Sequence, residues 1–221
     1  MYTDASRGAR ALLLLVVGAL ALASTPPMPA SARPVAQALE GQALVQALRG
    51  GGYTIFLRHS ITNPDDDTRI MEQYGQERLD SCEMQRNLTD EGRDQARAIG
   101  AAFRQLNIPV GDVLSSPYCR AMETANLAFG RATPLDALGM LPYQNVADRE
   151  PSNATLRQLL TTAPTAGTNL VIVSHSTNLI RAVDVTPESE GDAVIFRPGN
   201  DAPLTPVAIV PASDWAALAG P

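Results

Sequence analysis

The chain alternates short apolar runs with longer segments in which apolar side chains recur at helical spacing. Apolar runs rich in β-branched residues predict buried strands, because a strand covered on both faces carries few polar side chains. The strands expected on this basis are residues 53–57, 112–115, 170–174, 193–196 and 207–210. The run at 170–174 is the most apolar and predicts the central strand. The last two runs are candidates for antiparallel or edge strands.

Helical periodicity and capping residues predict the elements between these strands. Thr89 is a candidate N-cap before two acidic residues, and Gly130 is expected to end a helix that opens at Ser116. The predicted helices are residues 36–49, 89–106, 116–129, 152–160 and 177–183. Residues 63–80 are polar and predict a long loop over the site. Strands that alternate with helices predict an α/β fold, a three-layer α/β/α sandwich around a mostly parallel sheet.

The first residues are typical of a signal peptide rather than of the fold. Arg7 and Arg10 precede an apolar run at 11–23, and small residues follow it. We therefore expect a signal peptide at 1–23, a flexible tether at 24–35 and a single domain at 36–221. Cleavage after Ala32 and a retained membrane anchor remain alternatives. Export to the periplasm or the medium is expected, with no stable membrane insertion once the signal is removed.

Export changes how the two cysteines are interpreted. An oxidising compartment lets Cys82 and Cys119 pair, and we favour a disulfide over two buried thiols. Such a bond would tie the loop before one helix to the loop that carries Arg120. Neither cysteine has the spacing of a metal ligand, so no metal is expected. The net charge of −6 and the absence of a basic run make the chain a poor candidate for binding nucleic acid.

The two histidines of the chain each follow a predicted strand. His59 comes after residues 53–57 and is preceded by Arg58, and His175 comes after residues 170–174. Ligands of open α/β sheets bind at the carboxyl ends of strands. A third predicted strand end is followed by Arg120. Two arginines and two histidines that converge on one point match the need of phosphoryl transfer for positioning and spread positive charge.

Four segments, in this order, resemble the histidine phosphatase superfamily, which has the phosphoglycerate-mutase-like fold. Arg58–Thr62 is similar to the Arg-His-Gly-x-Thr motif, with Ser60 in place of glycine. The others are a Leu-Thr-x-x-Gly-x-x-Gln-Ala helix start at 88–96, a Ser-Ser-Pro-x-x-Arg-x-x-x-Thr-Ala segment at 115–125 and a strand that ends in histidine at 171–175. Each motif alone is weak, and four in order are a strong signal.

The resemblance implies that His59 is the nucleophile and forms a phosphohistidine that water then hydrolyses. Arg58, Arg120 and His175 would complete the phosphate pocket, and Thr62 would add a hydroxyl that binds substrate. It further implies a phosphoric monoester hydrolase of the histidine acid phosphatase type that needs no cofactor. The expected ligand is a small phosphorylated molecule or inorganic phosphate.

The general acid that would protonate the leaving group is not identified by the sequence. Asp148, Glu150 and Glu190 are the candidates. Without an acid, the enzyme would favour good leaving groups such as phosphoramidates, anhydrides or aryl esters. A non-catalytic or narrow-range phosphate-binding protein and a phosphatase of phosphohistidine in proteins therefore remain alternatives, and a mutase is less favoured.

Overall fold

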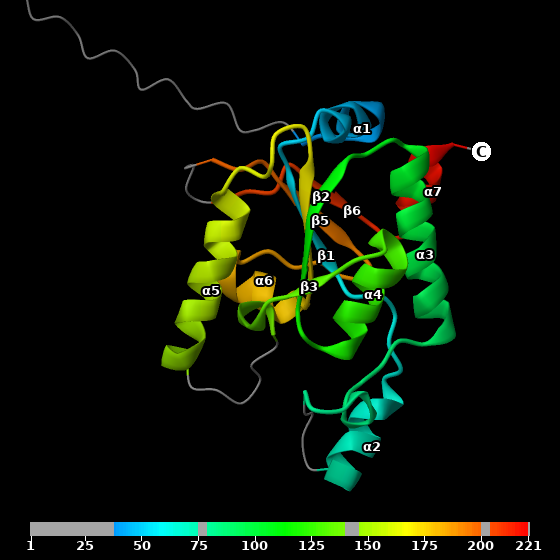
Figure 1. The fold of residues 1–221 in the computed structure, drawn as a ribbon, viewed down its shortest axis with the longest axis vertical. Coiled ribbons are helices and arrows are strands. Elements are labelled where there is room, and N and C mark those ends of the chain that lie inside the picture. Colours follow the sequence, from blue (N-terminus) through cyan, green and yellow to red (C-terminus); the bar gives the residue numbers. More distant parts are fainter. Residues whose placement is uncertain (1–37, 75–78, 140–145, 200–203, 221) are drawn as a thin grey trace, which may run out of the picture. The chain divides into compact units, whose positions relative to one another are not determined.

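Six strands form one mixed sheet in the described part of the chain (Figure 1). The computed structural model describes residues 38–74, 79–139, 146–199 and 204–220. The strands are β1 (Thr54–Arg58), β2 (Val110–Ser115), β3 (Thr133–Pro134), β4 (Asn169–Ser174), β5 (Ala193–Phe196) and β6 (Ala208–Val210). Their order is β3-β2-β4-β1-β5-β6. The predicted signal peptide and tether lie outside the described residues.

The first four strands of that order run parallel, and β5 and β6 are antiparallel to their neighbours. β4 lies inside the sheet and is buried along its whole length, as predicted from its apolar run. The pairing of β1 with β4 sets Arg58 opposite Ser174, so the residues that follow these strands leave the sheet side by side. The mostly parallel sheet predicted from the sequence is confirmed.

Helices cover both faces of the sheet. They are α1 (Gly41–Arg49), α2 (Asp65–Tyr74), α3 (Asp90–Gln105), α4 (Cys119–Phe129), α5 (Val146–Thr161), α6 (Ser176–Val183) and α7 (Asp214–Ala219), with short 3₁₀ turns at Cys82–Met84 and Asp136–Leu138. All belong to the unit Ala36–Pro221, and that this unit is one phosphatase-like domain stays a prediction. Among the described residues, no helix has the length and apolar character needed to cross a membrane.

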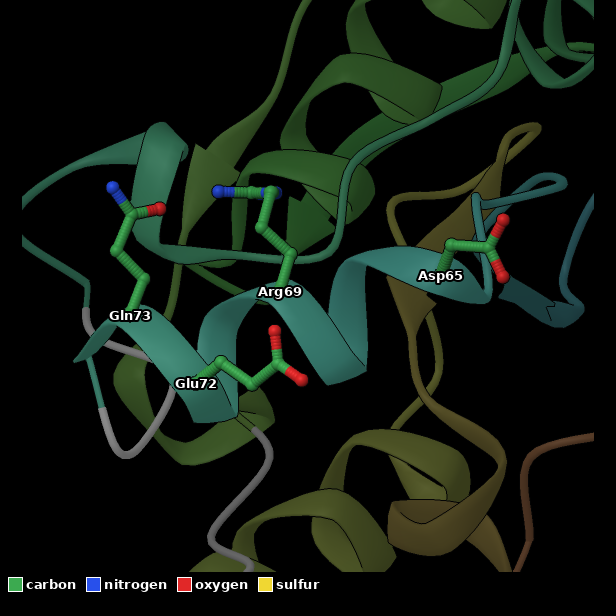
Figure 2. Close-up of a pocket in the computed structure, with 4 residues that line it drawn as sticks. All are labelled: Asp65, Arg69, Glu72 and Gln73. Carbon is green, nitrogen blue, oxygen red and sulfur yellow. The ribbon is translucent and has the colours of Figure 1, made fainter.

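The segment predicted as a long loop contains helix α2, so that prediction is wrong for residues 65–74. Three consecutive aspartates occupy its first turn, where negative charge is favourable. Ile70 of this helix is buried, and Asp66 accepts a hydrogen bond from the backbone N–H of Asn87 at 3.0 Å. A pocket beside α2 is lined by Asp65, Arg69, Glu72 and Gln73, whose side chains Figure 2 shows. No residue predicted for the phosphate site lines this pocket.

The other predicted elements are present and differ from the prediction mainly at their ends, whereas β3 and α7 were not predicted. Helix α4 begins at Cys119 rather than at Ser116, and helix α5 begins before Pro151 rather than after it. Thr89 caps α3 as predicted, because its hydroxyl accepts a hydrogen bond from the backbone N–H of Gly92. The expected strands 193–196 and 207–210 correspond to β5 and β6, which are antiparallel, with β6 at the edge.

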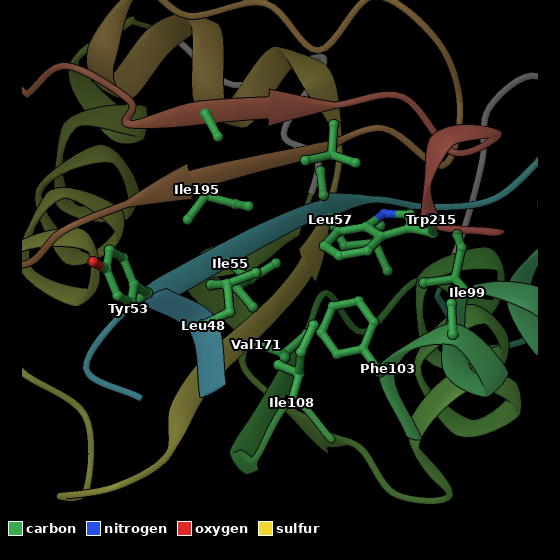
Figure 3. Packing of buried hydrophobic residues seen from close by; sticks show 14 of the residues in the cluster. Leu48, Tyr53, Ile55, Leu57, Ile99, Phe103, Ile108, Val171, Ile195 and Trp215 are labelled. Carbon is green, nitrogen blue, oxygen red and sulfur yellow. The ribbon is translucent and has the colours of Figure 1, made fainter. Parts of the chain in front are cut away.

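Side chains that alternate along the strands build two separate cores. On one face Ile55 and Leu57 pack with Phe103 and Trp215, which come from α3 and α7 (Figure 3). On the other face Phe56 and Ile172 pack against leucines of α5 and α6. The α/β/α layering predicted from the sequence is therefore confirmed. Apolar contacts on both faces hold the sheet and fix the loops that follow β1, β2 and β4.

Candidate active site

The two histidines meet at the carboxyl ends of neighbouring strands. His59 follows β1, and its backbone N–H donates to the carbonyl oxygen of Ser174, 3.0 Å away, in the last residue of β4. The imidazole rings of His59 and His175 lie 5.2 Å apart between centroids, edge to face. Both side chains are almost fully buried, at 3% and 2% exposed. The structure thus brings together the two residues that the sequence places 116 positions apart.

The hydrogen bond of His59 determines which nitrogen can react. Its Nδ1 lies 2.9 Å from the carbonyl oxygen of Ser60. A carbonyl only accepts hydrogen bonds, so Nδ1 carries the proton and Nε2 has a free lone pair. Burial, followed by the charge of Arg120, lowers the pKa of His59 to about 3. The ring is therefore neutral at physiological pH, which is the state that a nucleophile requires.

His175 contacts the protein through its other ring nitrogen, Nε2. Its Nε2 is 2.8 Å from the hydroxyl of Ser116, which also accepts the backbone N–H of Tyr118. Its buried Nδ1 has no hydrogen-bond partner among the described residues. Burial and then Arg120 lower the pKa of His175 well below its usual value. A neutral His175 whose Nε2 accepts from Ser116 carries its proton on Nδ1, where it can donate to an oxyanion.

The two predicted arginines reach the histidines from different elements. Arg120 is buried in the first turn of α4, and its guanidinium lies 4.7 Å from the centre of the Tyr118 ring. Nη1 of Arg58 donates to the carbonyl oxygen of Glu188 at 2.9 Å, whereas its buried Nε has no partner among the described residues. Arg58 Nε, and His175 Nδ1 when Ser116 donates to Nε2, are thus buried donors without a partner among the described residues.

The turn after His59 is held by the residues of two other predicted motifs. The backbone N–H of Ser60 donates to the hydroxyl of Thr124, 3.0 Å away. Helix α3 packs so closely on the turn that a Cβ atom on Gly92 would lie 2.0 Å from the carbonyl oxygen of Ile61. Gln95 accepts from the backbone N–H of Ile61 at 3.3 Å. These motifs therefore position the His59 turn.

The three candidate acids have different positions. Oε1 of Glu190 lies 3.9 Å from Nδ1 of His59. Glu150 forms an ion pair with Arg157 on the same helix, α5. The side chain of Asp148 lies outside the described part of the structure. Thr62, predicted to bind substrate, donates its hydroxyl to Glu190 at 2.7 Å.

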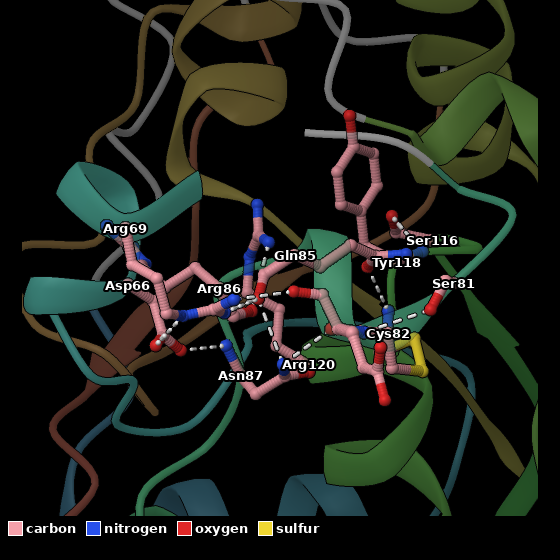
Figure 4. The surroundings of a disulfide bond; sticks show 12 residues. Asp66, Arg69, Ser81, Cys82, Gln85, Arg86, Asn87, Ser116, Tyr118 and Arg120 are labelled. Atoms are coloured by element: carbon pink, nitrogen blue, oxygen red, sulfur yellow. Dashed lines mark hydrogen bonds and ion pairs between the residues drawn. A yellow bond between two sulfur atoms is a disulfide. The ribbon is translucent and has the colours of Figure 1, made fainter. Parts of the chain in front are cut away.

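The disulfide predicted from export is present between Cys82 and Cys119. It ties the segment before α3 to the start of α4, where Arg120 lies, as expected (Figure 4). The same segment carries Arg86, whose backbone oxygen accepts from Nη1 of Arg120 at 3.3 Å. Nη2 of Arg86 donates to Glu190 at 3.1 Å. The disulfide therefore holds a third arginine at the site.

Sequence reasoning missed the roles of Ser116, Tyr118 and Arg86 in building this site. Ser116 and Tyr118 lie inside a recognised motif, directly after β2, and this position was the available signal. Arg86 had no such signal, because its carboxylate partner Glu190 is 104 residues away. Within the described residues, no group of three or more His, Cys, Asp or Glu side chains could hold a metal ion.

A known family model matches the part of the chain that carries three of the four predicted core residues of the site. The family model of the histidine phosphatase superfamily (branch 1) matches residues 54–142. This range holds Arg58, His59 and Arg120. The predicted resemblance to the histidine phosphatase superfamily is confirmed. A phosphatase-type function is the activity that this resemblance supports.

Several solved structures resemble this histidine-phosphatase-like chain at low identity. A phosphoserine phosphatase from Entamoeba histolytica, in complex with 3-phosphoglyceric acid, is 16% identical, with a TM-score of 0.47, and the match covers 72% of this chain and 96% of that one. The protein histidine phosphatase SixA, complexed with tungstate, is 16% identical, with a TM-score of 0.47 and coverage of 73% and 98%. A phosphoglycerate mutase from Thermus thermophilus is 18% identical, with a TM-score of 0.46 and coverage of 72% and 98%.

A search of curated proteins found no match.

Proposed function

We propose that the protein is an exported phosphatase that hydrolyses phosphomonoesters or related phospho-compounds through a phosphohistidine on His59. The observation that carries the proposal is the pairing of a neutral nucleophile with unused donors. His59 presents a free Nε2, and Arg58 Nε and His175 Nδ1 are buried donors without a partner among the described residues. Burying such donors is costly unless a ligand completes their hydrogen bonds.

In the proposed reaction the phosphoryl oxygens accept hydrogen bonds from Arg58, Arg120 and His175. Nε2 of His59 forms a bond to phosphorus while the bond to the leaving oxygen or nitrogen breaks, and that atom takes up a proton from solvent water. A water molecule then attacks phosphorus and gives up a proton to solvent, the N–P bond breaks, and Nε2 regains its lone pair as inorganic phosphate forms. No metal or organic cofactor takes part. The positive charge of the arginines stabilises the charge that spreads over the phosphoryl oxygens.

Glu190 favours one narrower substrate class, phosphoramidates such as phosphohistidine in proteins. Both of its carboxylate oxygens accept hydrogen bonds from Thr62 in the structure, so they are engaged by that residue rather than directed at a leaving group. A phosphoramidate nitrogen leaves more easily than an alkoxide and depends less on an acid. Export itself is proposed from the sequence of residues 1–23 alone.

The test is hydrolysis of p-nitrophenyl phosphate by residues 24–221 in the presence of a chelator, with His59→Ala measured beside it. We expect turnover that survives chelation and falls by at least about 10³-fold in the variant, because the covalent step is lost. Ser213→Ala, at an exposed position, controls for effects of mutagenesis and purification on turnover. Turnover that persists in His59→Ala would refute the proposal.

A further inference from the structure

Glu190 is the carboxylate that lies among the cations of the phosphate site in the described residues. Its Oε1 accepts the Thr62 hydroxyl at 2.7 Å and Nη2 of Arg86 at 3.1 Å. The same oxygen is 3.7 Å from Nη2 of Arg58 and 3.9 Å from Nδ1 of His59. Oε2 accepts the backbone N–H of Thr62 at 2.9 Å. Its side chain is 18% exposed, so water screens these contacts only in part.

The backbone around Glu190 is tied to the His59 turn, so the carboxylate is held in place. The N–H of Gly191 donates to the carbonyl oxygen of His59 at 3.0 Å. The carbonyl oxygen of Glu190 accepts from Nε2 of Gln95 at 3.1 Å. Arg58 donates to the carbonyl oxygens of Pro187 and Glu188, which shortly precede Glu190 in the sequence. The segment therefore presents a fixed negative charge to the site.

These contacts give Glu190 the surroundings of a counter-ion. Both oxygens accept, and two of the neighbouring groups are guanidinium cations. A phosphoryl group at His59 requires the positive charge of Arg58, which Glu190 partly offsets. Because both groups are anions, they compete for the same cations and repel each other.

We propose that Glu190 is a built-in competitor of the phosphoryl group, which weakens the binding of phosphate dianions and speeds release of product phosphate. This inference rests on the proposed phosphatase function. A phosphate dianion carries more negative charge than the metaphosphate-like group of a loose transition state. A fixed carboxylate therefore destabilises bound substrate and product more than it destabilises the transition state. When the bound substrate is destabilised more than the transition state, the barrier between them falls. Turnover then rises, while affinity for the substrate does not.

The test measures binding of inorganic phosphate to the mature protein by calorimetry and by inhibition of p-nitrophenyl phosphate hydrolysis. Glu190→Gln removes the charge with little change in size, and Glu190→Ala removes the carboxylate without placing an amide against Arg86. Arg86 keeps a carboxylate partner in both variants, because its Nη1 also donates to Asp67 at 3.0 Å. Glu91→Gln is the matched control, since Glu91 is exposed in the first turn of α3.

We expect both Glu190 variants to bind phosphate about tenfold more tightly and to turn over more slowly, as repulsion between two nearby anions predicts. Glu91→Gln should stay within about twofold of wild type, since exposed charges are screened. Equal or weaker phosphate binding in the Glu190 variants, or an equal gain in Glu91→Gln, overturns the inference. The proposed function still stands in that case if the wild type binds phosphate and its hydrolysis depends on His59. A wild type with neither property overturns the proposed function together with the inference.

Discussion

The two histidines of the site use different ring nitrogens, and a neighbouring residue sets each choice. The carbonyl of Ser60 fixes the proton of His59 on Nδ1, which leaves Nε2 as a nucleophile. The hydroxyl of Ser116 is hydrogen-bonded to Nε2 of His175, which leaves Nδ1 for a ligand. Neutral imidazoles with opposite orientation can thus serve as nucleophile and as donor in one pocket. Ser116 is a positioning residue in this account, because it acts through His175.

Replacing Ser116 by alanine tests this at the level of one hydroxyl. We expect kcat to fall about 10- to 100-fold, since leaving a buried nitrogen unsatisfied costs about 1–3 kcal/mol and frees the ring to change tautomer. The measurement is hydrolysis of p-nitrophenyl phosphate, together with thermal unfolding. Ser115→Ala is the matched control, because Ser115 bonds the carbonyl of Ser116 rather than a histidine. Equal losses of activity in the two variants would contradict a specific role for Ser116.

At the level of elements, helix α3 packs against the His59 turn and supports it. Thr89 caps the helix, and Gly92 allows its first turn to touch the carbonyl of Ile61. A second close approach on the same helix, at Gly100, lies against the carbonyl of Ala128 in α4. The two glycines face similar steric limits, but only Gly92 contacts the active-site turn. Substitutions at these two glycines therefore distinguish the effect of helix packing on stability from the effect of the His59 turn on activity.

Gly92→Ala and Gly100→Ala would each bring a Cβ atom to 2.0 Å from a backbone oxygen. We expect each to lower the free energy of unfolding by about 1–3 kcal/mol, the usual cost of overpacking. Only Gly92→Ala should also lower kcat/KM by about tenfold or more, as expected when catalytic groups are displaced. Urea unfolding and kinetics on the folded variants decide the matter. The account is wrong if Gly100→Ala loses as much activity.

The disulfide links two elements of the site, and its removal should affect both stability and substrate binding. It closes a loop between residues 37 positions apart. Cys82→Ser with Cys119→Ser is expected to lower the free energy of unfolding by about 2–4 kcal/mol through loop entropy. KM should rise several-fold, because the segment with Arg86 is released from the start of α4. A reductant should lower Tm of the wild type and leave the double variant unchanged; equal Tm values without reductant would count against this.

For the molecule as a whole, the two buried histidines couple folding to pH. The pKa of His59 is lowered from 6.5 to about 3, mainly by burial. The pKa of His175 is lowered as well, for the same main reason. Below pH 6.5 the unfolded chain binds protons at these histidines that the folded chain does not bind. The stability that they contribute is complete above pH 6.5 and is lost as the pH falls toward 3.

We therefore predict that unfolding free energy declines between pH 6.5 and about 4.5, and that His59→Ala declines less steeply. The difference should approach about 1.4 kcal/mol per pH unit, the value for one proton. Urea unfolding at several pH values measures both slopes. Titrating groups remote from the site contribute equally to each protein, whereas the pKa of His175 is itself lowered in part by His59. Identical slopes would mean that His59 is protonated in the folded state, which would exclude it as a nucleophile at those pH values.

Local patterns were enough to predict five of the six described strands and the convergence of the two histidines, whereas strand β3 was not predicted. Residues 169–174 are buried on both faces, and such strands are recognisable as apolar runs. Helix α2 was missed because its sequence is polar and its Asp66 accepts a hydrogen bond from Asn87, 21 positions away. Helix α7 was missed because it has six residues and depends on packing of Trp215 against Phe103. Both are stabilised by contacts distant in sequence.

The same limit applies inside the site. His59, Arg58, Arg120 and His175 stand at strand or helix ends within recognisable motifs, so their convergence follows from topology. The Ser116–His175 and Arg86–Glu190 contacts join residues 59 and 104 positions apart. No local pattern encodes which polar side chain will meet which across loops. Glu190 was one of three candidate acids, and only the structure gives its partners.

The most direct test of this account is to trap the phosphoenzyme. Mature protein is mixed with p-nitrophenyl phosphate, quenched in alkali, in which phosphohistidine survives, and digested for mass spectrometry. We predict phosphate on the peptide that contains His59, on the ring of that residue, and none in His59→Ala. Phosphate on another residue, or steady turnover with no phosphoenzyme in a quench faster than kcat, would contradict the account.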